Sequence, residues 1–309
     1  MTGRFILSFD CEGKWGVADH LGPGEHRALG DAPLRRAYRS VVALLDEFDI
    51  PATFAFVGLF GEDHSSFRRL RPAIEQLAAR AADYLQPALD DMDHGSREGW
   101  HGDWAVELAG ATRTQHEIAM HGVTHFPWDR MDEAFVADEM AIYAELEGPV
   151  GRSRTMVFPR NKVAHADRLP SIGIEAYRLA PRRRSRLESL ATEFNLLERA
   201  ERDPARRDAG SIPIPAGYFV NWQSGLRRLV PQAVSELRFG HILDDAWRSG
   251  GVAHFWLHPE NIASAPATLD LLRRMIRRVA RARDAGRCTV QTQIDYCRQM
   301  KIALPPEVE

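Results

Sequence analysis

The sequence predicts an α/β fold with parallel strands, of a size that suits a (β/α) barrel. Apolar, β-rich segments of strand length alternate along the chain with segments of helical periodicity. Acidic, histidine and arginine residues directly follow several of the predicted strands, and parallel α/β folds collect functional groups at the carboxyl ends of their strands. A chain of 309 residues is long enough for one barrel, so residues 1–309 are assigned to a single domain.

The N-terminal segments predict a βαβ unit. A strand over Phe5–Phe9 ends at Asp10, and a glycine-rich loop follows over residues 13–30. Asp31 is expected to cap a helix whose apolar side chains recur at helical spacing. A second apolar strand covers Ile50–Gly58. This order of strand, helix and strand favours a right-handed crossover between parallel neighbours.

Residues 61–115 interrupt this alternation and are predicted to be an insertion of helix and loop. A helix is expected over Phe67–Tyr84, and a long polar loop over Asp90–Trp104 because that stretch is rich in glycine and histidine. Beyond the insertion, strands are predicted at Gln115–Met120, Thr155–Pro159, 176–180, 211–215 and Val252–Leu257, and helices at Asp132–Glu147, 166–172, 185–200, Pro231–Trp247 and 267–285.

Composition and charge argue against several classes of function. The net charge of −3 gives no overall attraction to nucleic acid or to anionic membranes. The three cysteines form no Cys-x-x-Cys pair, so neither a disulfide framework nor a cysteine zinc site is expected. No apolar run has the length of a transmembrane helix, and the segment before residue 10 is too short for a signal peptide. These features predict a soluble cytoplasmic protein with no nucleic-acid partner.

Two histidines and two acids form the most informative pattern. His121 and His125 follow a predicted strand, and Asp10 and Glu12 follow the first strand. Alternate residues of a strand share a face, so the two acids are expected on one side and Cys11 on the other. Two histidines and one carboxylate, with a fourth position open, form a common catalytic zinc shell. The pattern therefore predicts a divalent ion held by the histidines and a strand-end carboxylate, with Asp10 beside it as a base.

Four short motifs resemble those of the polysaccharide deacetylases, the NodB-homology group of family 4 carbohydrate esterases. They are Ser8–Gly13 with its two acids, His121–His125, Phe158–Lys162 with a proline and an arginine, and Leu257–Pro259 with a leucine and a histidine. Their order and approximate spacing match that family from residue 5 to about residue 261. The resemblance implies a distorted barrel of the deacetylase type and metal-dependent removal of acyl groups from sugars.

The resemblance also implies a role for each matching residue. Asp10 takes the place of the general base, and Glu12, His121 and His125 take the places of the metal ligands. The family usually has two adjacent aspartates, whereas here Cys11 separates the acids, which makes the chain an Asp-x-Glu variant. The family's fourth motif supplies an aspartate that orients the catalytic histidine, and we identify no counterpart for it, so the acid in that role is left open.

Two further residues are assigned from the chemistry of amide hydrolysis together with the family motifs. His258 is the candidate acid that protonates the leaving amine, because imidazole titrates close to neutral pH. Arg160 is expected to pair with Asp10 and to keep it ionised. In this chain the arginine follows its proline, whereas in the family the arginine precedes it.

Three neighbours of these motifs are assigned to substrate binding. Leu257 and Trp256 are expected to form the wall of a small pocket for an acetyl methyl group, and Asn161 is expected to contact the substrate. The cofactor is expected to be one divalent ion, and the ligand set suits zinc, although cobalt, manganese, nickel or iron fit the same shell. The run Arg182–Arg184 is interpreted as solvated, with contact to a substrate phosphate as the alternative.

These assignments predict a hydrolase that removes an N-acetyl or other N-acyl group from an amino sugar. The substrate is expected to be a cytoplasmic intermediate of a surface polysaccharide such as lipopolysaccharide O-antigen, linked to a nucleotide or a lipid. Another metal hydrolase on a similar barrel (a deformylase, a cyclic amidase or a phosphoesterase) and a non-catalytic sugar-binding relative are left as alternatives. A retaining glycosidase with Asp10 and Glu12 as its carboxylates ranks last, because it leaves the histidines unexplained.

Overall fold

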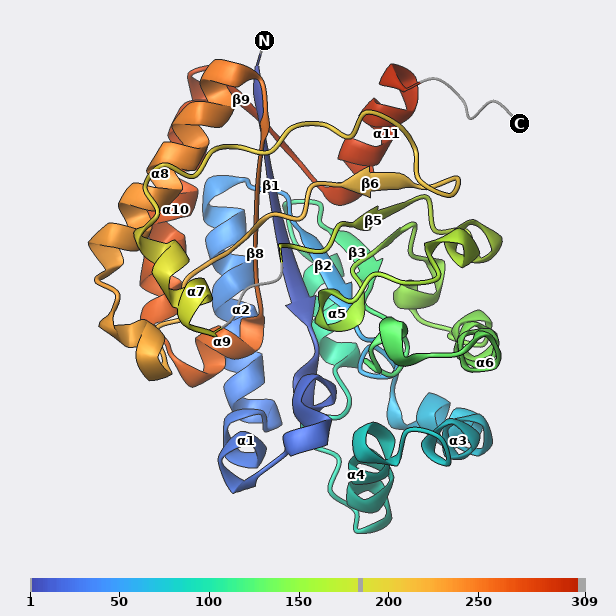
Figure 1. Cartoon of the computed structure of the whole chain (residues 1–309). Helices are drawn as coiled ribbons and strands as arrows, with labels where there is room; N and C mark the ends of the chain where they lie inside the picture. Colours follow the sequence, from blue (N-terminus) through green and yellow to red (C-terminus); the bar gives the residue numbers. More distant parts are fainter. Residues whose placement is uncertain (1, 183–185, 305–309) are drawn as a thin grey trace.

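One sheet of parallel strands organises the computed structural model, which describes residues 2–182 and 186–304 (Figure 1). The strands are β1 (Gly3–Cys11), β2 (Thr53–Phe56), β3 (Glu117–Met120), β4 (Thr155–Met156), β5 (Ala176–Arg178), β6 (Ile212–Ile214), β7 (Tyr218–Phe219), β8 (Val252–Leu257) and β9 (Cys288–Gln291). They follow the order β6-β5-β4-β3-β2-β1-β8-β7, and β9 pairs with β1. All these pairs are parallel, and β6 and β7 stand at opposite ends of the order, so the predicted distorted barrel is confirmed.

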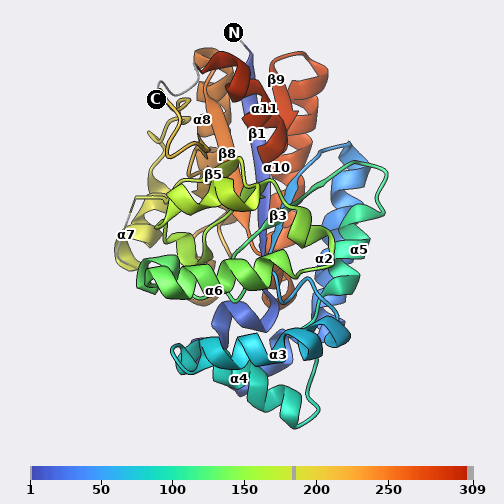
Figure 2. The same cartoon turned by 90° about the vertical axis from the view of Figure 1, so that its right-hand side faces the viewer.

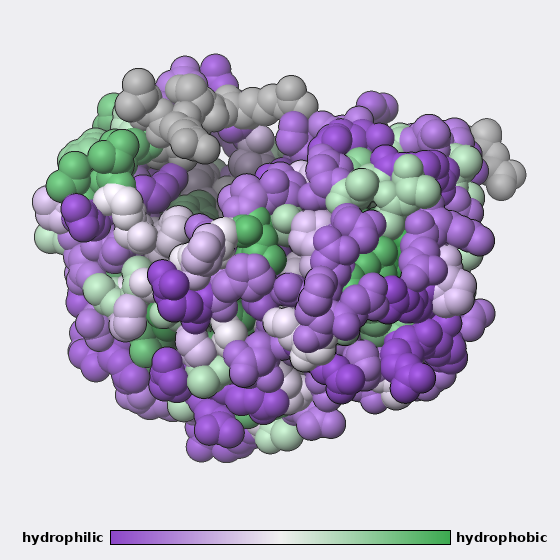
Figure 3. Space-filling model, turned by 90° about the horizontal axis from the view of Figure 1, so that it is seen from below, coloured by the Kyte–Doolittle hydropathy of each residue, from purple (hydrophilic) through white to green (hydrophobic). Residues whose placement is uncertain are grey.

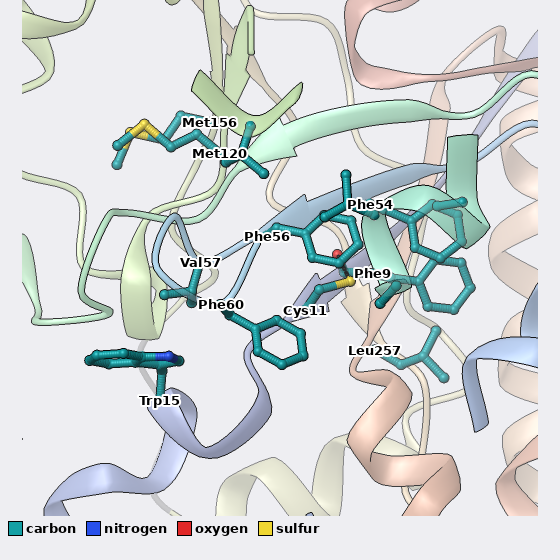
Figure 4. Close-up of a cluster of buried hydrophobic side chains, with 14 of the residues drawn as sticks. Phe9, Cys11, Trp15, Phe54, Phe56, Val57, Phe60, Met120, Met156 and Leu257 are labelled. Atoms are coloured by element: carbon teal, nitrogen blue, oxygen red, sulfur yellow. Dashed lines mark hydrogen bonds between the residues drawn. The ribbon is translucent and has the colours of Figure 1, made fainter. Parts of the chain in front are cut away.

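Strand β1 is the centre of the sheet. Its residues Arg4–Phe9 pair with β8 along one edge. Along the other edge Gly3–Ile6 pair with β9 and Ser8–Cys11 pair with β2. Successive side chains of β1 point alternately to the inside of the barrel and to the helix layer. Both sets are buried, because the strand is covered along its whole length. Phe9 and Cys11 face the helix layer, where they pack among Phe54, Phe56 and Leu257 (Figure 4).

Helices cover the outside of this sheet and the carboxyl ends of its strands. In Figure 1, α2, α8 and α10 lie beside β1 and β8, and in Figure 2 α3 and α4 lie beyond the ends of the strands. Among the described residues no helix combines the length and the apolarity needed to cross a bilayer. The helices are α1 (Pro23–Ala28), α2 (Asp31–Phe48), α3 (His64–Ala78), α4 (Ala82–Asp93), α5 (Asp103–Gly110), α6 (Glu133–Ala144), α7 (Arg186–Ala191), α8 (Gln232–Ser249), α9 (Pro259–Ser264), α10 (Ala267–Asp284) and α11 (Gln293–Ala303).

Short 3₁₀ helices fill several connections: η1 (Gly13–His20), η2 (Trp128–Arg130), η3 (Pro149–Arg152), η4 (Pro159–Asn161), η5 (Ala166–Ile172), η6 (Thr192–Phe194) and η7 (Gly225–Leu229). The prediction of an irregular loop over residues 13–30 is therefore wrong, because η1 and α1 lie there. Asp31 does not cap α2; its carboxylate accepts a hydrogen bond from the backbone N–H of Gly99 instead. The glycine-rich segment η1 is helical because tertiary contacts bury its side chains Trp15 and Ala18.

The predicted insertion over residues 61–115 contains more helix than expected. The single helix predicted over Phe67–Tyr84 is two helices, α3 and α4, separated by a turn at residues 79–81. This turn lets α4 fold back and bury Tyr84, Leu85 and Leu89 against η1. The polar loop predicted over Asp90–Trp104 is shorter, because α4 continues to Asp93 and α5 begins at Asp103. The elements that the sequence did not reveal include α5, β7, α9, β9 and α11.

Candidate active site

The carboxyl ends of β1, β3 and β8 bring five chemically active side chains together. Asp10 and Glu12 come from the end of β1, His121 and His125 from the end of β3, and His258 from the residue after β8. Asp10 and the two histidines that follow β3 are each 1% exposed, so most of this group is shielded from water. Arg160, which was predicted to pair with Asp10, is not among these five side chains.

The carboxylate of Glu12 is the point on which three imidazoles converge. Its Oε1 lies 3.0 Å from Nε2 of His121, 3.0 Å from Nε2 of His125 and 3.3 Å from Nε2 of His258. Burial by itself raises the pKa of Glu12, but His125, His258 and His121 outweigh it and hold the pKa well below its usual range. The ligand atoms of Glu12, His121 and His125 all lie within 4.8 Å of one another, which is the clustering that a shared cation requires.

The donor chemistry of these three residues fits a divalent metal. Nδ1–H of His121 donates to the carbonyl of Val157 at 2.8 Å, so its Nε2 carries the lone pair that a metal binds. His125 also presents Nε2, and its buried Nδ1 has no hydrogen-bond partner among the described residues. Neutral imidazole nitrogens and a carboxylate oxygen suit zinc and the neighbouring divalent transition metals.

The loop between the two histidines is held in an unusual conformation. His125 has φ +61, which is rare for a residue with a side chain and is typical of functional sites. Gly122 has φ +70, and a Cβ there would lie 2.6 Å from Cγ of Pro159, so only glycine fits. Glu139 on α6 fixes the loop by accepting hydrogen bonds from the backbone N–H groups of Val123 and Thr124. Burial raises the pKa of Glu139 to about 7 despite these donors.

Asp10 is paired with an arginine that the sequence analysis did not select. Arg178, at the end of β5, donates from its two Nη atoms to Oδ1 at 2.8 Å and to Oδ2 at 2.6 Å of Asp10. Both residues are 1% exposed. Burial raises the pKa of Asp10, but the charges of Arg178, His121 and His258 outweigh it and lower the pKa below its ordinary value. Asp10 is therefore an ionised carboxylate at neutral pH.

The expected pair between Arg160 and Asp10 is not formed. Arg160 has φ +54, and this left-handed turn directs its guanidinium to Oδ1 of Asp19 at 2.6 Å, near the surface. Its neighbour Asn161 does reach the site, where Oδ1 accepts a hydrogen bond from Arg178 at 2.8 Å. The strand predicted over residues 176–180 contains Arg178, but only the structure ends β5 at this residue and so places it at the carboxyl end, where functional groups collect.

A buried set of polar groups holds Arg178 in place. Nη1–H of Arg178 donates to Oγ of Ser8 at 3.2 Å, and Oγ–H of Ser8 lies 2.9 Å from Nε2 of His254. Nδ1 of His254 donates to the carbonyl of Pro215 at 2.7 Å, which leaves Nε2 as the acceptor. Burial lowers the pKa of His254 to about 3, so this ring stays neutral. The guanidinium carbon of Arg178 lies over the ring of Trp256, 4.7 Å from the ring centroid.

An amide, rather than an acid, orients His258. Nδ1 and the backbone N of His258 both lie 3.1 Å from Oδ1 of Asn261, which is three residues later at the start of α9. Nδ1–H therefore donates to Asn261, and Nε2 faces Glu12 at 3.3 Å and Oδ2 of Asp10 at 4.0 Å. Burial lowers the pKa of His258, but the two carboxylates outweigh it and raise the pKa to about 10. The ring is thus protonated when Glu12 and Asp10 are ionised.

A pocket of about 600 Å³ opens beside His258. Asn161 and Trp256 line it, together with the aromatic side chains of Tyr218, Phe219 and Trp222. Leu257 does not line it. Because residues alternate along β8, Trp256 faces the pocket and Leu257 faces the helix layer, where it is fully buried near Phe9 (Figure 4). Arg182 and Arg160 also contribute to the lining, while Arg183 and Arg184 lie outside the described residues.

Solved structures reveal which proteins share this architecture. The whole chain aligns with 93% of a Mycobacterium smegmatis protein assigned as a polysaccharide deacetylase, at a TM-score of 0.58 and 17% sequence identity. A Pseudomonas aeruginosa PAO1 protein with the same assignment aligns over 98% of this chain and 92% of its own, at a TM-score of 0.56 and 13% identity. The chain has the polysaccharide deacetylase fold.

The polysaccharide deacetylase fold is not tied to a single activity. Puue allantoinase aligns over 98% of this chain and 92% of its own, at a TM-score of 0.54 and 13% identity. No family model and no curated protein matches the sequence. The comparisons therefore establish the deacetylase fold, and the assignment of a reaction depends on the side chains that this chain places at the ends of its strands.

Gly16 provides a test of the position of Glu12 within the deacetylase fold. A Cβ on Gly16 would lie 1.9 Å from Oε2 of Glu12, so the change Gly16→Ala is expected to displace this carboxylate. We expect affinity for zinc, measured by calorimetric titration, to fall by about 10- to 100-fold, as for the loss of an outer-shell partner. The matched control is Gly24→Ala, because a Cβ on Gly24 meets no atom within 4 Å. Equal affinity in the two variants would contradict this account.

Proposed function

We propose that the protein is a metal-dependent N-deacetylase that acts on an amino sugar. The observation that carries this proposal is the convergence of an ionised Asp10, the triad of Glu12 with two histidines, and the protonated His258 beside one pocket. Hydrolysis of an amide needs a base for water, stabilisation of an oxyanion and an acid for the leaving amine. This site offers a separate group for each requirement.

Asp10 is proposed as the general base. A divalent ion held by Glu12, His121 and His125 would supply an acidified water molecule and a polarised acyl oxygen. Asp10 would accept a proton from the attacking water. The two Nη donors of Arg178 hold Asp10 ionised before the reaction and fix the orientation of its oxygens.

His258 is proposed as the general acid. Its Nδ1–H is engaged by Asn261, so the proton on Nε2 is the one that can be given to the leaving nitrogen. Nε2 lies 4.0 Å from Oδ2 of Asp10, so the base and the acid flank the same reacting group. Protonation of the amine allows the C–N bond to break, which releases acetate and a free amino sugar.

The pocket suits a sugar substrate. Tyr218, Phe219 and Trp222 offer aromatic faces on which the apolar face of a sugar ring can stack, and Asn161 offers an amide for its hydroxyl groups. Trp256, beside His258, is proposed to contact the acyl methyl. We further propose a cytoplasmic substrate, an intermediate of lipopolysaccharide O-antigen or a related surface glycan that is linked to a nucleotide or a lipid.

Acetate release from N-acetylated amino sugars tests this proposal. Wild-type protein loaded with zinc or cobalt is expected to release acetate and amine in equal amounts, and Asp10→Asn is expected to lower kcat by about 10²- to 10⁴-fold. Asp19→Asn serves as the control, because Asp19 pairs with Arg160 near the surface rather than with the reacting groups. Phosphate release from phosphate esters, or sugar binding without turnover in metal-loaded protein, would refute the deacetylase assignment.

A second candidate is hydrolysis of an amide that is not on a sugar. Its support is the TM-score of 0.54 with Puue allantoinase, whose name denotes a different substrate. The same base, acid and metal triad would serve such a reaction. The two candidates differ in product, because turnover of allantoin by this chain would favour the second and acetate release from an amino sugar the first.

A further inference from the structure

Five large apolar side chains are exposed on or beside the segments that line one side of the pocket. Phe194 is 54% exposed, Leu197 88%, Leu226 65%, Leu229 68% and Leu237 54%. Soluble proteins rarely gather exposed residues of this size on one contiguous surface unless the surface binds something. Figure 3 shows hydrophobic side chains collected at one edge of the face on which the strands end. We call these five side chains the apolar rim.

Buried ion pairs join the three segments that carry the apolar rim. Arg227 of η7 donates to Glu193 of η6 at 3.0 Å, and Arg238 of α8 donates to Glu198 at 2.6 Å. His241 of α8 also bonds the carbonyl of Leu196 at 2.7 Å. Glu193, Arg227 and Arg238 line the pocket, and each is the chain neighbour of a rim residue. The segments that carry the apolar rim therefore border the pocket.

Three arginines add exposed positive charge beside the apolar rim, where the exposed acid is Glu188 on α7. Arg182, Arg199 and Arg228 are exposed and have no ion-pair partner among the described residues. The acids between them, Glu193 and Glu198, have side chains only 4% and 11% exposed and are neutralised by arginines. The overall charge of −3 conceals this local excess of positive charge. Apolar side chains flanked by unpaired arginines are the composition of a surface that lies on an anionic membrane.

We propose that the apolar rim docks the pocket mouth onto an anionic lipid bilayer. The leucines and Phe194 would enter the boundary between head groups and acyl chains, and the three arginines would contact lipid phosphates. The pocket would then open toward the membrane surface. This proposal concerns binding and stands whether or not the protein is a deacetylase, so its failure leaves the proposed function untouched.

Co-sedimentation with vesicles tests this docking. Wild-type protein is expected to bind vesicles of phosphatidylcholine with phosphatidylglycerol and to bind phosphatidylcholine alone weakly. The double change Leu197→Asp and Leu229→Asp is expected to lower the bound fraction by about tenfold or more, and Arg228→Glu by at least about fivefold. Both variants alter only exposed side chains, so their thermal unfolding should match the wild type.

Matched controls come from the opposite side of the molecule. Ile302 on α11 is 90% exposed, and α11 lies far from α7 in Figure 1, so Ile302→Asp and Arg298→Glu are expected to leave vesicle binding unchanged. Absence of binding by the wild type, or equal binding by rim and control variants, would overturn the proposal. It would also be overturned if the wild type formed a dimer in solution that the rim variants lost, because the rim would then contact a second copy.

Discussion

Replacing Arg178 by methionine is expected to cost about 3–5 kcal/mol of unfolding free energy, because the change leaves Asp10 as a buried carboxylate without its cation. It is also expected to abolish hydrolysis, since Asp10 loses the two donors that keep it ionised and aligned. Arg178→Lys is expected to recover part of the stability but little activity, because an ammonium cannot reproduce a two-pronged contact. Denaturant unfolding and initial rates measure the two effects.

The matched control for Arg178 is the arginine that the sequence motif indicated. Arg160 pairs with Asp19 in a partly exposed ion pair, so Arg160→Met is expected to change stability by only about 0–1 kcal/mol. The double variant Asp10→Asn with Arg178→Met should regain part of the stability lost by Arg178→Met alone, because it removes the unpaired charge. If Arg160→Met were the variant that destroyed activity while Arg178→Met left it intact, the pairing described here would be incompatible with catalysis.

Loss of metal is the second large effect that the site predicts. Wild-type protein is expected to hold about one divalent ion per chain, and Glu12→Gln, His121→Ala and His125→Ala are each expected to lower metal affinity by more than about 100-fold, beyond the loss typical of an outer-shell residue. Because a ligand that binds only the folded state stabilises it, removing the metal with a chelator should lower the melting temperature of the wild type. Elemental analysis and thermal unfolding provide the two readouts.

His258 separates metal binding from proton transfer. It lies outside the triad whose ligand atoms cluster together, so His258→Ala is expected to keep the metal while turnover falls by about 10²- to 10⁴-fold. His20→Ala is the control, because His20 is exposed and contacts Asp19 rather than the triad. A protein that stays folded without stoichiometric metal, even after zinc or cobalt is added, would remove the basis of the hydrolase mechanism.

Much of the candidate site was accessible from local sequence rules. The strand period of two predicted that Asp10 and Glu12 share a face while Cys11 points away, and the structure confirms that Cys11 is buried in the helix layer. The rule that parallel strands end at one edge predicted that His121 and His258 would meet these acids. These rules work because β1, β3 and β8 are regular, and their backbone leaves each side chain one of two directions.

Three site residues were predicted wrongly or missed: Arg160, Leu257 and Arg178. Arg160 follows a proline and adopts φ +54, and no sequence rule used here foresees such a left-handed turn for an arginine. Leu257, in contrast, was predictable, because the strand alternation that places Trp256 in the pocket places its neighbour in the helix layer. Arg178 lay inside a predicted strand and belonged to no motif, so only its position in space revealed its role.

The sequence by itself determined the fold class and the chemical character of the centre, because strand periodicity and strand-end motifs are local properties of the chain. The tertiary structure decided which groups complete that centre. Arg178 reaches Asp10 across 168 residues of sequence, whereas Asn261, which orients His258, lies only three residues from it. The apolar rim likewise depends on three segments held together by buried ion pairs. Pairing between residues far apart in the sequence depends on how strands and loops pack, and the local pattern of residues does not predict it.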